Sequence, residues 1–260
     1  MLNNLNFNFS NIKSFSLFEC ENFFSEDFYK DLSTNFPLNN EGDINTKILK
    51  DQRNKKFVIN NEMSIYHELL KKNIAMKKLD ETVISQDFIN FIYKKLYFHF
   101  IKSKFRNIKD LIKLLKRPRL IKKEKINNFF NQEINVTIEY SYILNSGKIV
   151  PHTDNPSKLL SLMLYFPEYQ DKEEKLKKKE EEIGTIFWKS NTKNFSNIHQ
   201  FGNLEKEFIE DKSNQKIFQT KFKGNHLYGF VKNERSWHSV DEVDMHDNYI
   251  RKSININFHF

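Results

Sequence analysis

The sequence predicts a mainly β protein with a helical N-terminal half, an α+β fold whose second half forms a jelly roll of two facing sheets. In the first half, apolar residues recur at spacings of three and four, which is typical of helices. From Asn135 onward they alternate with a period of two, which is typical of strands. We therefore expect a helical support region over residues 1–130 and a β core over residues 131–260, packed as one compact unit.

Composition limits the classes of protein to which the chain can belong. Its 260 residues include 26 Phe and 10 Tyr, so large rings can fill a core although only 38% of the residues are hydrophobic. The net charge of +8 comes with many Lys, Asn, Ile and Phe residues, which indicates AT-rich codons, and we do not expect a nucleic-acid partner. One cysteine, no secretion signal and no membrane-spanning run favour a cytoplasmic protein.

The first half contains segments with the apolar stripe of packing helices. The segment that begins at Ser25, a suitable N-cap, ends just before Pro37, which cannot continue a helix. Between the first two helical segments, residues 38–60 are polar and irregular. The predicted packing helices are 25–36, 64–72 and 85–105.

Two charged segments stand apart from this pattern. Residues 106–130 are basic with a few leucines and are interrupted by Pro118, which predicts a basic amphipathic helix on the surface. Residues 170–182 are too charged to bury and predict a solvated helix or loop inserted between strands, without a role in chemistry.

Eight short β-rich runs follow in the second half, and eight strands joined by short turns favour a jelly roll. The last run alternates strictly, so one face is polar and the other apolar. We expect the polar face to line a ligand cavity and the apolar face to pack under the N-terminal helices. The eight runs are 135–144, 149–154, 158–166, 184–190, 216–222, 226–231, 237–243 and 251–260, and the polar face of the last is Arg251, Ser253, Asn255, Asn257 and His259.

His152 and Asp154 lie at the end of the second run, two positions apart, so both side chains project to the same side of an extended chain. A second histidine would complete a set of two imidazoles and one carboxylate, which suits ferrous iron and leaves coordination positions open for a cosubstrate and dioxygen. His238 on the seventh run is the preferred candidate, with His226 and His246 as alternatives. The remaining histidines are interpreted as surface or core residues: His67, His99, His199 and His259.

Arg251 opens the last run, and its guanidinium can bind a carboxylate through two parallel hydrogen bonds, as the distal carboxylate of 2-oxoglutarate requires. Ser253 shares its face and can donate a further hydrogen bond to the same carboxylate. Tyr142 on the first run is a third candidate, although a tyrosine on an apolar strand face is more often a core residue.

Substrate contacts are expected near the ligand-bearing strands. Lys158, Asn233 and Arg235 are candidates because they adjoin those strands, and ordinary solvated loop side chains are the alternative. If Lys158 and Arg235 converge, the substrate is expected to be anionic.

Four segments, PHTDNPSK, GTIFW, RSWHSV and RKSININF, together resemble the 2-oxoglutarate and Fe(II)-dependent oxygenase superfamily, in the prolyl 4-hydroxylase-like group. The resemblance covers residues 134–260, and FECENFFSEDFYKDLSTNFP resembles the group's helical lead-in. It implies a double-stranded β-helix, with His152, Asp154 and His238 binding Fe(II) and Arg251 anchoring 2-oxoglutarate. Dioxygen would be the second cosubstrate and ascorbate an accessory reductant.

Two departures narrow the activity that the resemblance implies. Prolyl 4-hydroxylases carry a lysine where this chain has Arg251, so peptidyl proline does not follow as the substrate. Nucleic-acid demethylases repeat an arginine six residues after the anchor, where Asn257 stands here.

The expected reaction is hydroxylation of an unactivated carbon in a small-molecule, sugar or peptidyl substrate, with release of succinate and carbon dioxide. A binding module that keeps the jelly roll without turnover is the alternative, and a basic nucleic-acid scaffold is a third.

Overall fold

The protein is described by a computed structural model over residues 2–38, 55–121, 130–191 and 208–260, apart from residues 4, 11, 13, 106 and 171. The eight predicted β-rich runs each overlap a strand of the second half. These strands are β5 (Asn131–Leu144), β6 (Ile149–His152), β7 (Lys158–Phe166), β8 (Ile186–Lys189), β9 (Gln215–Gln219), β10 (His226–Val231), β11 (Trp237–Val240) and β12 (Ile250–His259).

The first half contributes both helices and strands. Its helices are α1 (Glu26–Thr34), α2 (Ser64–Lys72), α3 (Ile74–Val83), α4 (Gln86–Lys104) and α5 (Ile108–Leu114), and the second half adds α6 (Glu174–Glu181). Its strands are β1 (Asn8–Phe9), β2 (Leu17–Glu21), β3 (Lys56–Asn60) and β4 (Arg117–Leu120). None of the helices in the described part of the chain is long and apolar enough to cross a membrane.

The described strands form two sheets. The larger follows the order β1-β2-β10-β7-β12-β5-β3, with β4 paired to β5 outside this path, and the smaller follows the order β6-β11-β8-β9. From β5 to β12 the chain passes repeatedly between the sheets. One hydrophobic cluster joins them, in which Met163 and Phe230 of the large sheet pack with Phe187 and Val240 of the small one. The two sheets therefore face each other across a shared interior.

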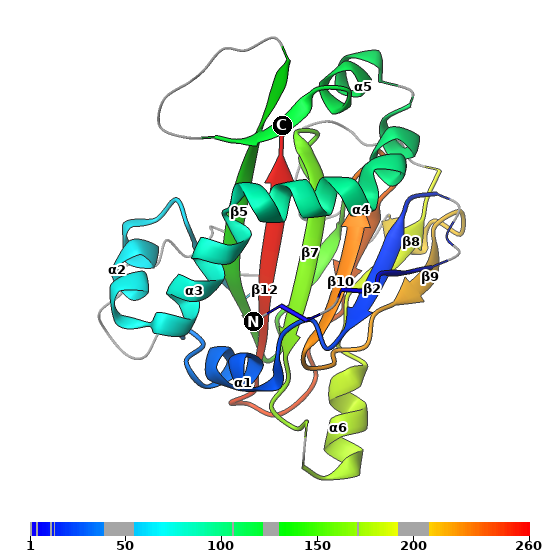
Figure 1. The fold of residues 1–260 in the computed structure, drawn as a ribbon. Helices are drawn as coiled ribbons and strands as arrows, with labels where there is room; N and C mark the ends of the chain where they lie inside the picture. The colour runs from blue at the N-terminus through cyan, green and yellow to red at the C-terminus, as the bar shows by residue number, and fades with distance from the viewer. Residues whose placement is uncertain are drawn as a thin grey trace.

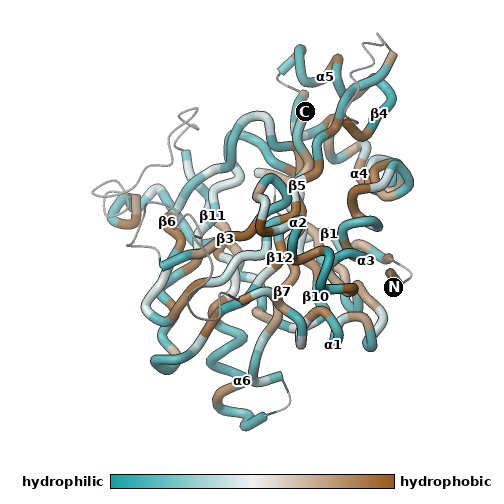
Figure 2. The backbone as a smooth tube through the Cα atoms, turned by 90° about the vertical axis from the view of Figure 1, so that its left-hand side faces the viewer, coloured by the Kyte–Doolittle hydropathy of each residue, from teal (hydrophilic) through white to brown (hydrophobic). Residues whose placement is uncertain are grey.

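Helices cover the other face of the large sheet. In Figure 1, α4 crosses in front of β5, β12, β7 and β10. Figure 2, turned by a quarter, shows β6 and β11 on one side, α3 and α4 on the other, and large-sheet strands between them. Ile254 and Ile256 of β12 belong to the same buried cluster as Ile92 and Leu96 of α4. The apolar face of the last strand thus packs under the helices, as its alternation predicts.

The N-terminal half is less helical than its sequence pattern predicts. β2 pairs with β10, and β3 pairs with β5, so both strands extend the large sheet. β3 lies within residues 38–60, which the sequence predicted to be irregular, and residues 39–54 lie outside the described part of the chain. A five-residue strand at a sheet edge has little local signal, because pairing with the neighbouring strand stabilises it.

The basic segment 106–130 is not one helix. α5 ends at Leu114, and Arg117–Leu120 forms the strand β4, which runs parallel to the start of β5. Pro118 is the physical reason, since it lacks a backbone N–H and is tolerated in an edge strand but not inside a helix. Residues 106 and 122–129 lie outside the described part.

The charged insertion 170–182 contains the mostly exposed helix α6 between β7 and β8, as predicted, but one residue near its end is buried. Glu180, near the end of α6, is only 1% exposed. Its carboxylate accepts hydrogen bonds from the backbone N–H groups of Glu168 and Tyr169, at 2.7 and 2.9 Å, and from the hydroxyl of Tyr249. These contacts fix the end of the insertion against the large sheet, directly before Ile183.

Candidate metal centre

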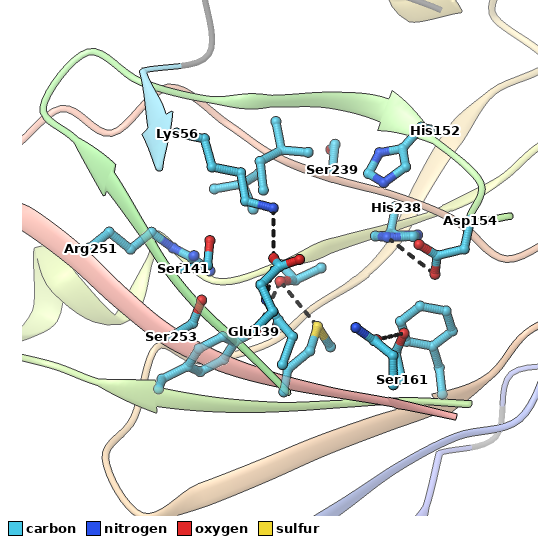
Figure 3. A pocket seen from close by; sticks show the side chains of 18 of the residues that line it. Lys56, Glu139, Ser141, His152, Asp154, Ser161, His238, Ser239, Arg251 and Ser253 are labelled. Atoms are coloured by element: carbon cyan, nitrogen blue, oxygen red, sulfur yellow. Dashed lines mark hydrogen bonds and ion pairs between the residues drawn. The ribbon is translucent and has the colours of Figure 1, made fainter. Parts of the chain in front are cut away.

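The candidate metal centre lies where β6 and β11 pair, because their register places His152 directly opposite His238. The two imidazole centroids are 4.3 Å apart. Asp154 follows β6 by two residues, and its Oδ2 is 3.9 Å from Nε2 of His238. One donor atom from each of these residues lies within 4.8 Å of the other two. Figure 3 shows the three side chains converging at one end of a cavity.

Both imidazoles are oriented by the backbone. Nδ1 of His152 lies 2.9 Å from the carbonyl oxygen of Val150, and Nδ1 of His238 lies 3.0 Å from that of Ser236. A carbonyl oxygen only accepts hydrogen bonds, so each Nδ1 carries the proton and donates it. Each Nε2 then presents its lone pair, which is the form in which a histidine binds a metal ion.

The two carboxylate oxygens of Asp154 differ in their hydrogen-bond partners. Oδ1 pairs with Nζ of Lys158 at 2.8 Å, whereas the buried Oδ2 has no hydrogen-bond partner among the described residues. Burial raises the pKa of Asp154, but Lys158, His238 and His152 outweigh that effect and hold the pKa well below its usual value. A buried anionic oxygen without a partner is costly unless a cation binds it. Two imidazole nitrogens and this oxygen fit a ferrous ion.

The alternative distal histidines lie elsewhere. Nε2 of His226 is 3.1 Å from a carboxylate oxygen of Glu19, at the pairing of β10 with β2. His246 is exposed and contacts Tyr169. In the described part of the chain, His152, Asp154 and His238 are the His, Cys, Asp or Glu side chains that come close enough to share a metal ion. His199 lies outside that part.

A cavity of about 630 Å³ extends from this cluster between the two sheets. Arg251 lines it and is only 3% exposed. Its Nε donates to the carbonyl oxygen of Ile183 at 2.7 Å, and its guanidinium lies over the rings of Tyr165 and Phe222, at 5.2 and 4.8 Å. Ile183, the residue that follows the insertion, therefore orients Arg251.

The charge of Arg251 has no acidic partner among the described residues. Burial lowers the pKa of its guanidinium, and nearby Tyr165 and Tyr249 counteract this. A guanidinium nonetheless stays protonated in proteins. A buried cation without a counter-ion is costly, so this end of the cavity is suited to an anionic ligand.

Hydroxyl groups surround the same end of the cavity. Ser253 is buried, lines the cavity and pairs across the sheet with Ser141, which also lines it. The Tyr165 hydroxyl is 2.8 Å from Oγ1 of Thr185. Ser253 was predicted from its place beside Arg251, whereas Ser141, Tyr165 and Thr185 were not. Ser141 could have been found, because it belongs to the polar half of the alternation in residues 135–144.

Tyr142 does not line the cavity. Its ring stacks on that of Phe57 in β3, with centroids 4.9 Å apart. The period of two explains this placement, since Glu139 and Ser141 face the cavity and Tyr142 faces the opposite side of the sheet. We therefore do not include Tyr142 among the residues proposed to contact a cosubstrate.

The three candidate substrate contacts do not come together. Lys158 lines the cavity, but its ammonium is paired with Asp154. Asn233 and Arg235 are absent from the described cavity lining and form a turn, in which Oδ1 of Asn233 accepts the backbone N–H of Arg235 at 2.8 Å. The proposed convergence of Lys158 and Arg235 is therefore not found.

A second set of polar side chains lines the cavity, and the sequence analysis did not predict it. Nζ of Lys56 lies 3.0 Å from Oε1 of Glu139, and Nδ2 of Asn255 donates to the same oxygen at 3.2 Å. All three line the cavity. Asn255 belongs to the polar face predicted for the last strand, and Glu139 follows from the alternation around it. Lys56 had no signal, because its segment was interpreted as irregular.

No family model matches the sequence, and no curated protein does. Similar solved structures include a prolyl-4-hydroxylase from Pseudomonas putida, at 11% identity and a TM-score of 0.44, covering 95% of this chain and 93% of that one. A prolyl hydroxylase from Trichoplax adhaerens, in complex with a hypoxia inducible factor peptide, matches at 12% identity and a TM-score of 0.45 over 94% and 83% of the two chains.

A third similar structure is HygX from Streptomyces hygroscopicus with nickel, 2-oxoglutarate and hygromycin B bound. It matches at 6% identity and a TM-score of 0.42, over 95% of this chain and 83% of that one. The structural neighbours thus include prolyl hydroxylases and a protein solved with a metal ion and 2-oxoglutarate.

Proposed function

We propose that the protein is a 2-oxoglutarate-dependent Fe(II) dioxygenase that hydroxylates an unactivated carbon of its substrate. One observation carries the proposal: a His–Asp–His cluster, whose buried carboxylate oxygen has no partner among the described residues, shares a cavity with a buried arginine that has no acidic partner among them either. The first feature suits a ferrous ion and the second suits a dicarboxylate. 2-Oxoglutarate has a carboxylate at each end, so it can join the two.

Each residue then has a defined task. Nε2 of His152, Oδ2 of Asp154 and Nε2 of His238 would hold Fe(II). When bound, the ion supplies the activation of dioxygen that the side chains of a protein cannot provide. Arg251 would bind the distal carboxylate of 2-oxoglutarate, and Ser253 would donate a further hydrogen bond. Both sites lie between the two sheets, and exclusion of bulk water on ligand binding would strengthen both interactions.

The overall reaction balances without another reactant. 2-Oxoglutarate, dioxygen and a substrate C–H bond give succinate, carbon dioxide and a C–OH bond. One oxygen atom enters succinate and the other enters the product. The oxidised cosubstrate and the C–H bond each provide two electrons, which together reduce dioxygen. Ascorbate would serve only to return oxidised iron to the ferrous state.

The proposal includes the type of fold formed by residues 131–260. The strand orders of the two sheets support a double-stranded β-helix, a jelly-roll variant, over residues 131–260. Residues 1–130 would act as a support region within one compact unit, through the helices that cover the large sheet. We also propose a cytoplasmic location, where ferrous iron persists in a reducing environment.

Anaerobic titration tests the proposed function. Addition of Fe(II) and then 2-oxoglutarate is expected to produce a weak visible charge-transfer band, and admission of air should release succinate slowly even without substrate. A binding module that keeps the fold without turnover would give neither signal. If no band forms at saturating Fe(II) and 2-oxoglutarate, the proposal is wrong.

Lys158 is expected to control how Asp154 binds the metal ion. Its ammonium occupies Oδ1, which leaves Oδ2 as the one free ligand oxygen. In K158M both oxygens can reach the ion and occupy a position that 2-oxoglutarate needs. We therefore expect K158M to lower affinity for 2-oxoglutarate by about tenfold or more, while affinity for Mn(II) is retained.

Calorimetric titration of Mn(II), followed by 2-oxoglutarate, measures the two affinities separately. K158R is the matched control, because it keeps a cation that can bind Oδ1 of Asp154. Its affinities for Mn(II) and for 2-oxoglutarate should be close to those of the wild type. Loss of Mn(II) binding in K158M with unchanged affinity for 2-oxoglutarate would contradict this role of Lys158.

A further inference from the structure

The cavity contains an ion pair that the proposed reaction does not use. Lys56 of β3 and Glu139 of β5 meet at 3.0 Å, with side chains 22% and 23% exposed. Asn255 of β12 adds a hydrogen bond to the same Glu139 oxygen. In Figure 3, Lys56 reaches from one wall of the cavity toward Glu139, between Arg251 and the His–Asp–His cluster.

The other charged groups of the described lining already have tasks. Arg251 is suited to the distal carboxylate, and Asp154 is paired with Lys158 beside the metal centre. Lys56 and Glu139 are the charged pair that remains. Burial raises the pKa of Glu139, but Lys56, Lys158 and Asn255 outweigh that effect and hold the pKa below its usual value, so Glu139 faces Lys56 as a carboxylate.

Stability of the fold does not explain this pair. Removing two charges from water costs about as much as their attraction returns, and apolar residues of similar size often serve as well or better. Other side chains of β3 and β5, such as Ile59 and Tyr140, already pack in the core between the sheet and the helices. The ion pair faces the cavity instead, where a ligand can reach it.

The charge of a ligand decides whether Lys56 and Glu139 can separate without leaving one of them unpaired. A neutral ligand leaves it closed. An anion that binds Lys56 leaves Glu139 without its partner, and a cation that binds Glu139 leaves Lys56 without one, which is costly for partly buried charges. A ligand with both a protonated amine and a carboxylate replaces one ion pair by two, and every charge keeps a partner.

We infer that the substrate is a small zwitterion, of the chemical class of a free α-amino acid, whose carboxylate binds Lys56 and whose ammonium binds Glu139. This inference rests on the proposed function. The cavity of about 630 Å³ is within the size range of small-molecule sites, roughly 300–1,000 Å³. Asn255 would stay beside Glu139 as a further hydrogen-bonding group, and a C–H bond of the side chain would become C–OH.

The twenty standard l-α-amino acids are the probes that test the inference. Each is incubated with the Fe(II)-loaded enzyme, 2-oxoglutarate and air, and both succinate and a product heavier by one oxygen atom are measured by mass spectrometry. At least one should raise succinate release about tenfold or more above the rate without substrate. Its N-acetyl and α-amide forms should not, because each lacks one of the two charges.

Variants of Lys56 and Glu139 test whether the amino acid that stimulates succinate release binds at this ion pair. K56M and E139Q should each raise the apparent KM for the active amino acid by roughly thirtyfold or more, since each removes one charged partner. The double variant K56M/E139Q leaves no unpaired charge, so it should fold, keep the charge-transfer band and lose the stimulation. The matched controls are K223M and E21Q, which alter an exposed ion pair of 3.4 Å whose residues do not line the cavity.

Two results would overturn the inference while leaving the proposed function intact. In the first, the charge-transfer band and slow succinate release are present, but none of the twenty amino acids stimulates the wild type. In the second, K56M weakens binding of 2-oxoglutarate itself in the anaerobic titration, which would make Lys56 a cosubstrate contact. Absence of the band in the wild type would instead refute the proposed function.

Discussion

Alanine at His152 or at His238 is expected to abolish stoichiometric binding of a divalent metal ion. Each histidine supplies one of the three donor atoms, and the backbone carbonyl that accepts its Nδ1 proton aims Nε2 at the site. Loss of an outer-shell partner alone typically costs about 10–100-fold in metal affinity, and loss of a direct ligand should cost more. The fold should remain, because both side chains line a cavity and do not fill the core.

Calorimetric titration with Mn(II) measures this effect. H246A is the matched control, because His246 is exposed and lies outside the cluster, and it should bind one ion per chain as the wild type does. Circular dichroism confirms that the variants are folded. Retention of one tightly bound ion in H152A or H238A would contradict the ligand assignment.

Methionine at Arg251 is expected to lower affinity for 2-oxoglutarate by roughly thirtyfold or more, because a buried charge-assisted interaction with the distal carboxylate is lost. Affinity for Mn(II) should hardly change, since Arg251 is not a metal ligand. Thermal stability should be kept or increased, because the variant removes a buried cation that has no acidic partner among the described residues.

Anaerobic titration of the charge-transfer band with 2-oxoglutarate gives the affinity directly. R251K is the informative comparison, because a lysine keeps the charge but cannot form two parallel hydrogen bonds. Its affinity for 2-oxoglutarate should lie between those of the wild type and R251M. If R251M binds 2-oxoglutarate as tightly as the wild type does, Arg251 is not the anchor.

Short-range patterns account for the parts of the site that could be predicted. The two-residue spacing of His152 and Asp154 in an extended segment places both on one side of the chain, and the structure brings them together with His238. The alternation in the last strand likewise places Arg251 and Ser253 on the cavity face. These inferences need only the period of a strand.

Long-range pairing accounts for what could not be predicted. β2 and β3 are short strands at the sides of the core sheet, and pairing with β10 and β5 joins them to it. Lys56 reaches the cavity through the pairing of β3 with β5, so its contact with Glu139 could not be predicted from the sequence. The burial of Glu180 could not be predicted for the same reason. Its carboxylate belongs to a charged helix and contacts Tyr249, which lies 69 residues further along the chain.

Tyr142 differs from the other candidates because it belongs to the apolar half of the alternation in β5. Tyr142 was considered as a cosubstrate contact although the period of two places it with Tyr140, which packs against the helices. The same period places Ser141 in the cavity. The alternation therefore favours Ser141 over Tyr142 as a cavity-facing side chain of β5.

Anomalous diffraction from crystals grown anaerobically with Mn(II) and 2-oxoglutarate tests the central claim most directly. We expect one strong peak within bonding distance of Nε2 of His152, Oδ2 of Asp154 and Nε2 of His238, with density for 2-oxoglutarate extending from it to Arg251. A cluster without a peak, or an ion bound at other residues, would contradict the account.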